Sequence, residues 1–163
     1  MPSYAIAVLG AIGSIVGIVD VVSRTILSLR DIQNRFKNAN FTLTSLIDEL
    51  TSTKAALNQV QALLNDLPED VEQYFLLIMD LSDALDSCRL LVDFINGRVS
   101  ELKMTEGGTG PTFESKVKIV LDDKHTTLCL EWVSRQVAAL NLLISVYQRL
   151  VYEEIVEHVA PVD

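Results

Sequence analysis

Residues 71–102 read VEQYFLLIMDLSDALDSCRLLVDFINGRVSEL, and their hydrophobic pattern decides the fold class. Apolar side chains recur every three or four residues, which is the spacing of one face of an α-helix. They are Val71, Phe75, Ile78, Leu81, Leu85, Cys88, Val92, Ile95, Val99 and Leu102. Just before them, Pro68 is followed by Glu69 and Asp70. Proline is tolerated at the first helical position and acidic groups there complement the helix dipole, so we expect the helix to start at Pro68.

The same spacing recurs in three other segments. The first contains Ala5, Val8, Ile12, Ile15, Val19, Val22, Ile26 and Leu29. The second contains Leu43, Leu46, Leu50, Thr53, Leu57, Val60, Leu64 and Leu67. The last contains Leu130, Val133, Val137, Leu140, Ile144, Tyr147 and Val151. No segment shows the two-residue alternation of a half-buried strand, so we predict an all-α fold, an antiparallel four-helix bundle.

The segments are separated by short linkers. Residues 38–40 can end one helix and cap the next. A Gly-rich loop is expected over residues 105–112. Residues 113–121 predict an extra short helix before the last long helix, with a break at Asp122 and Asp123. The stripes are wider than a coiled-coil seam, so we expect a globular bundle. Its core should contain Leu50, Leu57, Leu85, Val92, Leu140 and Ile144.

Composition indicates one folded domain over residues 1–163. Hydrophobic residues make up 49% of the chain, enough to disfavour disorder. The net charge of −9 argues against a nucleic-acid partner, and the acidic excess lies in the second half. The two cysteines make a secreted disulfide scaffold improbable and favour a reducing compartment. We expect Cys88 and Trp132 to lie in the core, and Asp80, Asp83 and Asp86 on a solvated face.

The N-terminal segment, residues 1–22, carries more apolar surface than packing requires. The first nineteen residues hold no charged side chain, yet they lack the basic start of a signal peptide. Asp20 closes the apolar run near the lower limit of a membrane span, and we expect a soluble protein. Residues 5–19 are apolar on every side of a helix, so we expect one face to meet something other than water. The candidates for membrane insertion or self-association are Ile6, Leu9, Gly10, Gly13, Val16 and Gly17.

The glycines of this segment have two interpretations. Glycine in a helix interior is less favourable than alanine by about 1 kcal/mol, so three of them need a reason. Gly13 and Gly17 form a G-x-x-x-G pair, which lets two helices approach closely, above all in lipid. The alternative is that the glycines let this helix pack closely against its neighbours in the bundle.

Several stretches resemble the HeLo-like family, the fungal N-terminal domain of STAND proteins. They are AVLGAIGSIVGIVD at residues 7–20, LIDEL at 46–50 with Leu57, LDSCRLL at 85–91, KVKIVL at 116–121 and AALNLL at 138–143. The motifs are degenerate, and their order along nearly the whole chain carries the resemblance. It implies a helical bundle fused to a nucleotide-binding oligomerisation module. The chain itself holds no Walker A motif, because residues 107–112 lack its Gly-Lys-Ser/Thr end, so we expect an excised domain or a stand-alone member.

The resemblance also implies a function. It points to the signalling and effector domain of an NLR-like innate immune receptor that acts in programmed cell death and heterokaryon incompatibility. On oligomerisation the N-terminal helix would insert into membrane lipid and permeabilise it. The protein would move from the cytoplasm to the plasma membrane, with itself and a nucleotide-binding module or receptor as partners. The alternative is a non-toxic interaction module.

An enzyme is not expected, and no cofactor or metal site is indicated. His125 and Cys129 lie four residues apart near Asp122, which is too few ligands for a metal site, although a thiol–imidazole pair is conceivable. Otherwise Cys129 packs at the core edge and His125 is solvated. His158 should be exposed near acidic residues. Histidine phosphotransfer domains are also helical bundles, but neither histidine lies in their Lys-Gly context.

Overall fold

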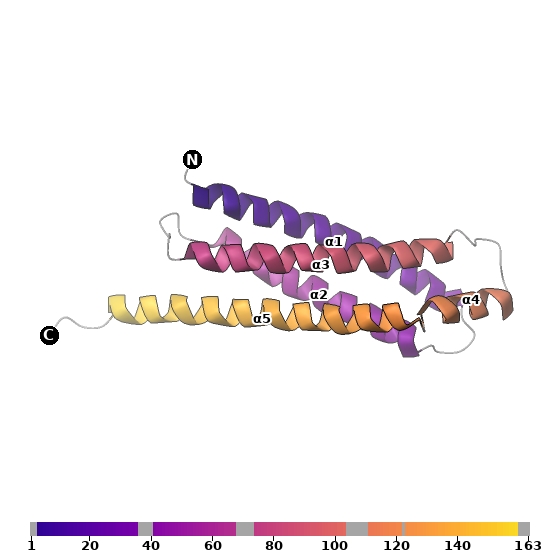
Figure 1. Ribbon diagram of the computed structural model, residues 1–163. Coiled ribbons are helices and arrows are strands. Elements are labelled where there is room, and N and C mark those ends of the chain that lie inside the picture. The colour runs from indigo at the N-terminus through magenta and orange to yellow at the C-terminus, as the bar shows by residue number, and fades with distance from the viewer. Residues whose placement is uncertain (1–2, 36–40, 68–73, 104–110, 122, 160–163) are drawn as a thin grey trace.

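The computed structural model describes residues 3–35, 41–67, 74–103, 111–121 and 123–159. These residues form five helices and no strand (Figure 1). The helices are α1 (Ser3–Arg35), α2 (Phe41–Asn65), α3 (Phe75–Lys103), α4 (Pro111–Leu121) and α5 (Lys124–Val159). The four long ones make an antiparallel bundle, and α4 is the extra short helix before the last long one. The all-α prediction is therefore confirmed.

The helices occupy the corners of a square. Helix α1 packs against α2 and α3, and α5 packs against the same two, so α1 and α5 are diagonal to each other. Helix α4 caps one end and touches α3 and α5. The outer faces of α1 and α5 consequently point away from each other.

The core follows the predicted stripes of α2 and α3 closely. In α2 every member from Leu43 to Leu64 is buried, including Thr53, whose hydroxyl donates to the Glu49 carbonyl oxygen at 2.8 Å. In α3 the members from Ile78 to Leu102 are buried as well. All six residues chosen as the core belong to one cluster: Leu50, Leu57, Leu85, Val92, Leu140 and Ile144. Cys88 lies in that cluster, as predicted.

The core face of α1 is rotated from the predicted one in its first half. Ala11 and Ile18 are buried, whereas Ile12 and Val19 from the predicted stripe are only half-buried. Because this half is apolar on every side, its pattern does not define a phase. Beyond Asp20 polar residues restrict the apolar stripe, and the predicted Val22 is fully buried.

Other expectations need correction. Phe75 is 37% exposed, and its neighbour Tyr74 takes the buried position instead. The predicted start at Pro68 lies outside the described residues, as do residues 38–40, Asp122 and most of the 105–112 loop. Helix α4 begins at Pro111, inside that loop, because proline suits a first helical turn. Trp132 is 56% exposed on α5 and not in the core.

Three tyrosines close the end of the bundle where α1 begins. The rings of Tyr74 and Tyr147 lie 5.6 Å apart, and Tyr4 of α1 packs against them. Burial, with Asp66, Tyr4 and Glu154 nearby, raises the pKa of the Tyr147 phenol. Beside them is a cavity of about 30 Å³ lined by apolar side chains such as Leu63. It has room for about one water molecule but offers no polar partner, so it is a dry packing void.

Three polar contacts join helices toward the end of the bundle that α4 caps. The Thr25 hydroxyl of α1 lies 3.0 Å from Asn96 Oδ1 of α3. Two residues further along α3, Arg98 pairs with Asp123, with Nη2 and Oδ2 2.7 Å apart. The Thr126 hydroxyl donates to the Val120 carbonyl oxygen at 2.9 Å and fixes the bend between α4 and α5.

Candidate functional site

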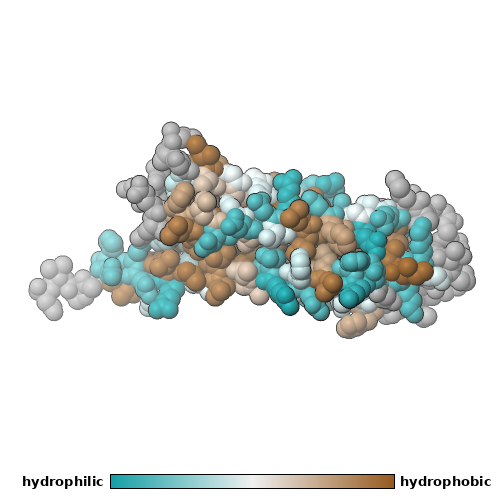
Figure 2. Space-filling model, in the orientation of Figure 1, coloured by the Kyte–Doolittle hydropathy of each residue, from teal (hydrophilic) through white to brown (hydrophobic). Residues whose placement is uncertain are grey.

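The six residues proposed from the sequence all lie exposed along one side of α1. Ile6, Leu9 and Val16 are 59%, 57% and 52% exposed. Gly10, Gly13 and Gly17 are exposed between them. We call these six residues the α1 outer face. Figure 2 shows hydrophobic side chains at the N-terminal end of α1, in the upper left of the view. The structure therefore brings the sequence-predicted residues together on one surface.

This surface changes character at Asp20. The Asp20 carboxylate pairs with Arg24, with Oδ2 and Nη2 2.8 Å apart, and both side chains are well exposed. One turn further on, Leu27 is an isolated exposed apolar side chain among charged residues. The second half of α1 is thus an ordinary solvated helix, and the apolar surface is confined to its first half.

The glycines are not required by packing inside the bundle. A β-carbon added at Gly10, Gly13 or Gly17 would meet nothing within 4 Å. The interpretation that they let α1 pack closely against its bundle neighbours is therefore wrong. Each glycine still weakens the helix relative to alanine, and the bundle gives no compensating contact.

The first two turns of α1 are also its least buried part. None of residues 4–10 is fully buried, and the first buried side chain is Ala11. Tyr4 packs against the other tyrosines at this end, and its buried hydroxyl has no hydrogen-bond partner among the described residues. Helix segments with few buried contacts open most readily, so the first two turns are the part of α1 that should separate from the bundle most easily.

Among the described residues, α1 is the one helix long and apolar enough to cross a membrane. That test uses length and composition alone, and the buried helix of a soluble protein can pass it. In α1, however, only 22% of the apolar window is buried by the bundle. The remaining residues of the window are partly buried or, on the α1 outer face, exposed.

The residues considered for catalysis do not form a site in the described part of the chain. Cys129 is buried, and its thiol lies 3.6 Å from the Leu91 carbonyl oxygen of α3. Burial raises the pKa of this thiol to about 11, and that of the Cys88 thiol equally, so both stay protonated at neutral pH. His125 is exposed, and so is His158, whose Nδ1 lies 2.9 Å from the Glu154 carbonyl oxygen. No three described histidine, cysteine or acidic side chains lie close enough to share a metal ion. The three aspartates at positions 80, 83 and 86 are exposed, as predicted.

Sequence reasoning missed a second apolar surface, on α5. Its outer side exposes Trp132, Leu142, Val146 and Leu150. The signal was present in the sequence, because these residues widened the apolar stripe of this segment beyond one core face.

Comparisons with protein-family models, curated proteins and solved structures find no match for this chain.

Proposed function

We propose that this protein is a membrane-active signalling domain whose α1 helix leaves the bundle and inserts its apolar first half into lipid. One observation carries the proposal: the α1 outer face is apolar and uncovered, and its three glycines have no packing partner in the bundle. A surface of this kind is unfavourable in water and favourable against lipid or another helix in lipid. The proposal agrees with the function implied by the resemblance to the HeLo-like family, the effector domain of a fungal NLR-like receptor.

Release of α1 requires a trigger, and oligomerisation is the natural one. Bringing several copies together places several α1 outer faces side by side, so that the glycines permit close contact between inserted helices. A nucleotide-binding module, in a longer chain or in a partner receptor, would supply that assembly. The protein would then pass from the cytoplasm to the plasma membrane and permeabilise it.

The charge distribution favours approach to the membrane through α1. Helix α1 carries Arg24, Arg30 and Arg35 against Asp20 and Asp31. The acidic excess of the chain lies in its second half. An anionic lipid surface attracts basic segments and repels acidic ones, so the first fifty residues lead the approach.

Val16→Glu tests the proposal. Val16 is exposed in the folded bundle, so glutamate there leaves the bundle folded. In lipid, a charged side chain costs about 2.5–3.5 kcal/mol at the helix centre on the insertion scale and less toward the ends, so glutamate at Val16, within the inserted half, still opposes insertion. We expect Val16→Glu to lose dye leakage from liposomes while keeping its helical circular dichroism spectrum. The matched control is Leu27→Glu, because Leu27 is also exposed on α1 but lies beyond Asp20, and this variant should keep leakage.

A second candidate function is a docking module whose α1 outer face binds protein and never lipid. The same uncovered face supports it, because another protein surface would cover it equally well. In that case the wild-type domain causes no leakage, and Val16→Glu abolishes association with the partner or with itself. Leakage that persists in Val16→Glu would refute the insertion mechanism.

A further inference from the structure

The outer face of α5 is a second uncovered apolar surface, separate from that of α1. Leu128, Trp132, Leu142, Val146 and Leu150 are all exposed on α5. They follow one another at steps of four, ten, four and four residues, which places them along one side of the helix. Figure 2 shows hydrophobic side chains gathered over the C-terminal half of α5 and the first turns of α3. We call these five residues the α5 outer face.

The charges along this face are arranged for a copy of itself. Arg135 and Glu153 lie on the same side of α5 as the apolar residues, because they are eighteen positions apart, which is five whole helical turns. Glu153 pairs with Arg149, with Oε1 and Nε 3.0 Å apart, and both side chains remain exposed. Ile144 lies midway between Arg135 and Glu153 along the helix and is on its buried side.

We propose that two copies of the chain associate through α5 in antiparallel fashion, about a two-fold axis at the level of Ile144. Arg135 of each copy then lies opposite Glu153 of the other, so the dimer contains this ion pair twice. Leu142 of each copy lies opposite Val146 of the other, which covers the apolar centre. A two-fold interface uses the same patch on both copies, and a patch with opposite charges equidistant from its centre fits that requirement.

The local charge of this part of α5 permits two acidic copies to associate there. Two copies with a net charge of −9 each repel one another over most of their surfaces. Between Leu128 and Val151 the charged side chains are Glu131, Arg135 and Arg149, so this part of α5 carries no acidic excess. This part of α5 is therefore less acidic than the chain as a whole, which limits the repulsion between two copies at the interface.

The α5 face leaves the α1 outer face free. Since α1 and α5 are diagonal in the bundle, a dimer joined through α5 carries its two α1 helices on the outside. The inference is thus independent of the membrane proposal, and each can fail while the other stands.

The test is the concentration dependence of mass, measured by sedimentation velocity of the 163-residue chain. Trp132 is the chain's single tryptophan and is 56% exposed, so its emission should shift to the blue as the dimer forms. A single helix pair makes a small interface, and we expect dissociation in the micromolar range. Val146→Glu should keep the helical spectrum and raise the dissociation constant at least tenfold, with Leu142→Glu as a second disrupting variant.

Charge reversal tests the register. Arg135→Glu and Glu153→Arg each create two like-charge contacts per dimer and should each weaken it about tenfold. The double variant should dimerise again, and so should an equimolar mixture of the two single variants, because each then supplies the charge that the other lacks. The proposal would be overturned by a chain that is monomeric at all concentrations. It would also be overturned by a dimer that is lost in Val16→Glu but kept in Val146→Glu, or by a mixture of the two single variants that fails to associate.

Discussion

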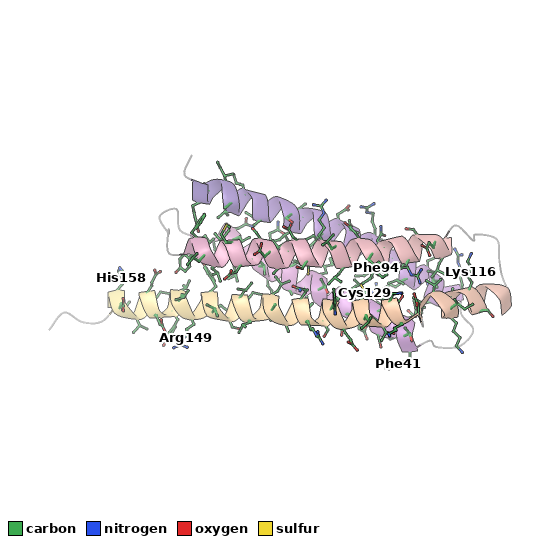
Figure 3. The ribbon with its side chains drawn as sticks, in the orientation of Figure 1. Phe41, Phe94, Lys116, Cys129, Arg149 and His158 are labelled. Atoms are coloured by element: carbon green, nitrogen blue, oxygen red, sulfur yellow. The ribbon has the colours of Figure 1, made fainter. Side chains whose placement is uncertain are left out.

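The Thr25 hydroxyl of α1 lies within hydrogen-bonding distance of two acceptors, Asn96 Oδ1 of α3 at 3.0 Å and the Val21 carbonyl oxygen at 2.8 Å. Thr25 is fully buried, and its contact with Asn96 is a side-chain hydrogen bond between α1 and α3. Figure 3 shows side chains filling the space between the helices of the bundle. Because α1 must leave α3 to reach a membrane, this contact opposes release.

Thr25→Val should therefore destabilise the bundle and favour release of α1. Valine has nearly the same shape but cannot satisfy Asn96, and loss of such a hydrogen bond costs about 1 kcal/mol. We expect a lower urea midpoint and faster liposome leakage at equal protein concentration. Thr53→Val is the matched control, because Thr53 is equally buried but bonds only to its own helix. Equal effects of the two substitutions on leakage would contradict the role given to Thr25.

Gly13→Ala should stabilise the folded bundle, by about 0.5–1 kcal/mol, because alanine is the better helix former and its methyl group meets open space. If inserted α1 helices pack through their glycines, the triple variant with Gly10, Gly13 and Gly17 changed to alanine should be more stable yet cause less leakage. Gly97→Ala on α3 is the control, since its site is equally open and it should stabilise without affecting leakage. A fall in the thermal midpoint of Gly13→Ala would show that α1 has a close neighbour at that position.

Leu57→Ala and Leu85→Ala should each destabilise the bundle by about 2–5 kcal/mol through lost burial and the cavity left behind. Both side chains are essentially inaccessible to solvent and lie in one core cluster. The comparison is Leu90→Ala, because Leu90 is 74% exposed on α3 and should change the urea midpoint little. Similar midpoints for all three variants would mean that the helical phases are misplaced.

The two buried thiols predict a loss of stability in alkali. Their pKa values are about 11 in the folded state, against an ordinary value of 9.0. Below about pH 8 both states hold the protons and the stability does not change. Between about pH 8 and 11 the unfolded chain loses them first, so the free energy of unfolding falls, by up to about 3 kcal/mol at pH 10. Urea titrations from pH 8 to 10.5 should show this decline.

The control for the alkaline decline is the double variant Cys88→Ala with Cys129→Ala. It should be less stable at neutral pH, because both side chains are buried, yet its stability should depend less on pH over the same range. A double variant with the same alkaline slope as the wild type would assign the decline to other groups.

The sequence predicted α2 and α3 well because polar residues mark their outer sides. Every position of the α2 stripe through Leu64 is buried, and the fold class follows from such stripes alone. The first half of α1 could not be phased in this way, since apolar residues on every side allow any rotation about the helix axis. There, tertiary contacts with α2 and α3 determine which side is buried, and they bury Ala11 and Ile18 more fully than Ile12 and Val19.

The sequence predicted which residues belong to the candidate site, but it did not predict which of them are exposed in the folded bundle. The absence of charge before Asp20 identified Ile6, Leu9 and Val16. Whether the glycines faced the bundle or solvent depended on the positions of the neighbouring helices, which no local pattern encodes. The same limit explains Trp132: size and hydrophobicity favour burial, and only the square arrangement of helices leaves it on the outer face of α5.

The length of the apolar half of α1 has a consequence for the kind of bilayer it can disturb. From Ser3 to Val19 the helix is continuous, and at 1.5 Å per residue it extends about 26 Å. A typical hydrocarbon core is about 30 Å thick, so with Asp20 and Arg24 at the near headgroups the Ser3 end reaches the far ones only if the bilayer thins locally. Liposomes of short-chain lipid should then leak more readily than those of long-chain lipid, and liposomes whose bilayer is thickened by sterol should leak least.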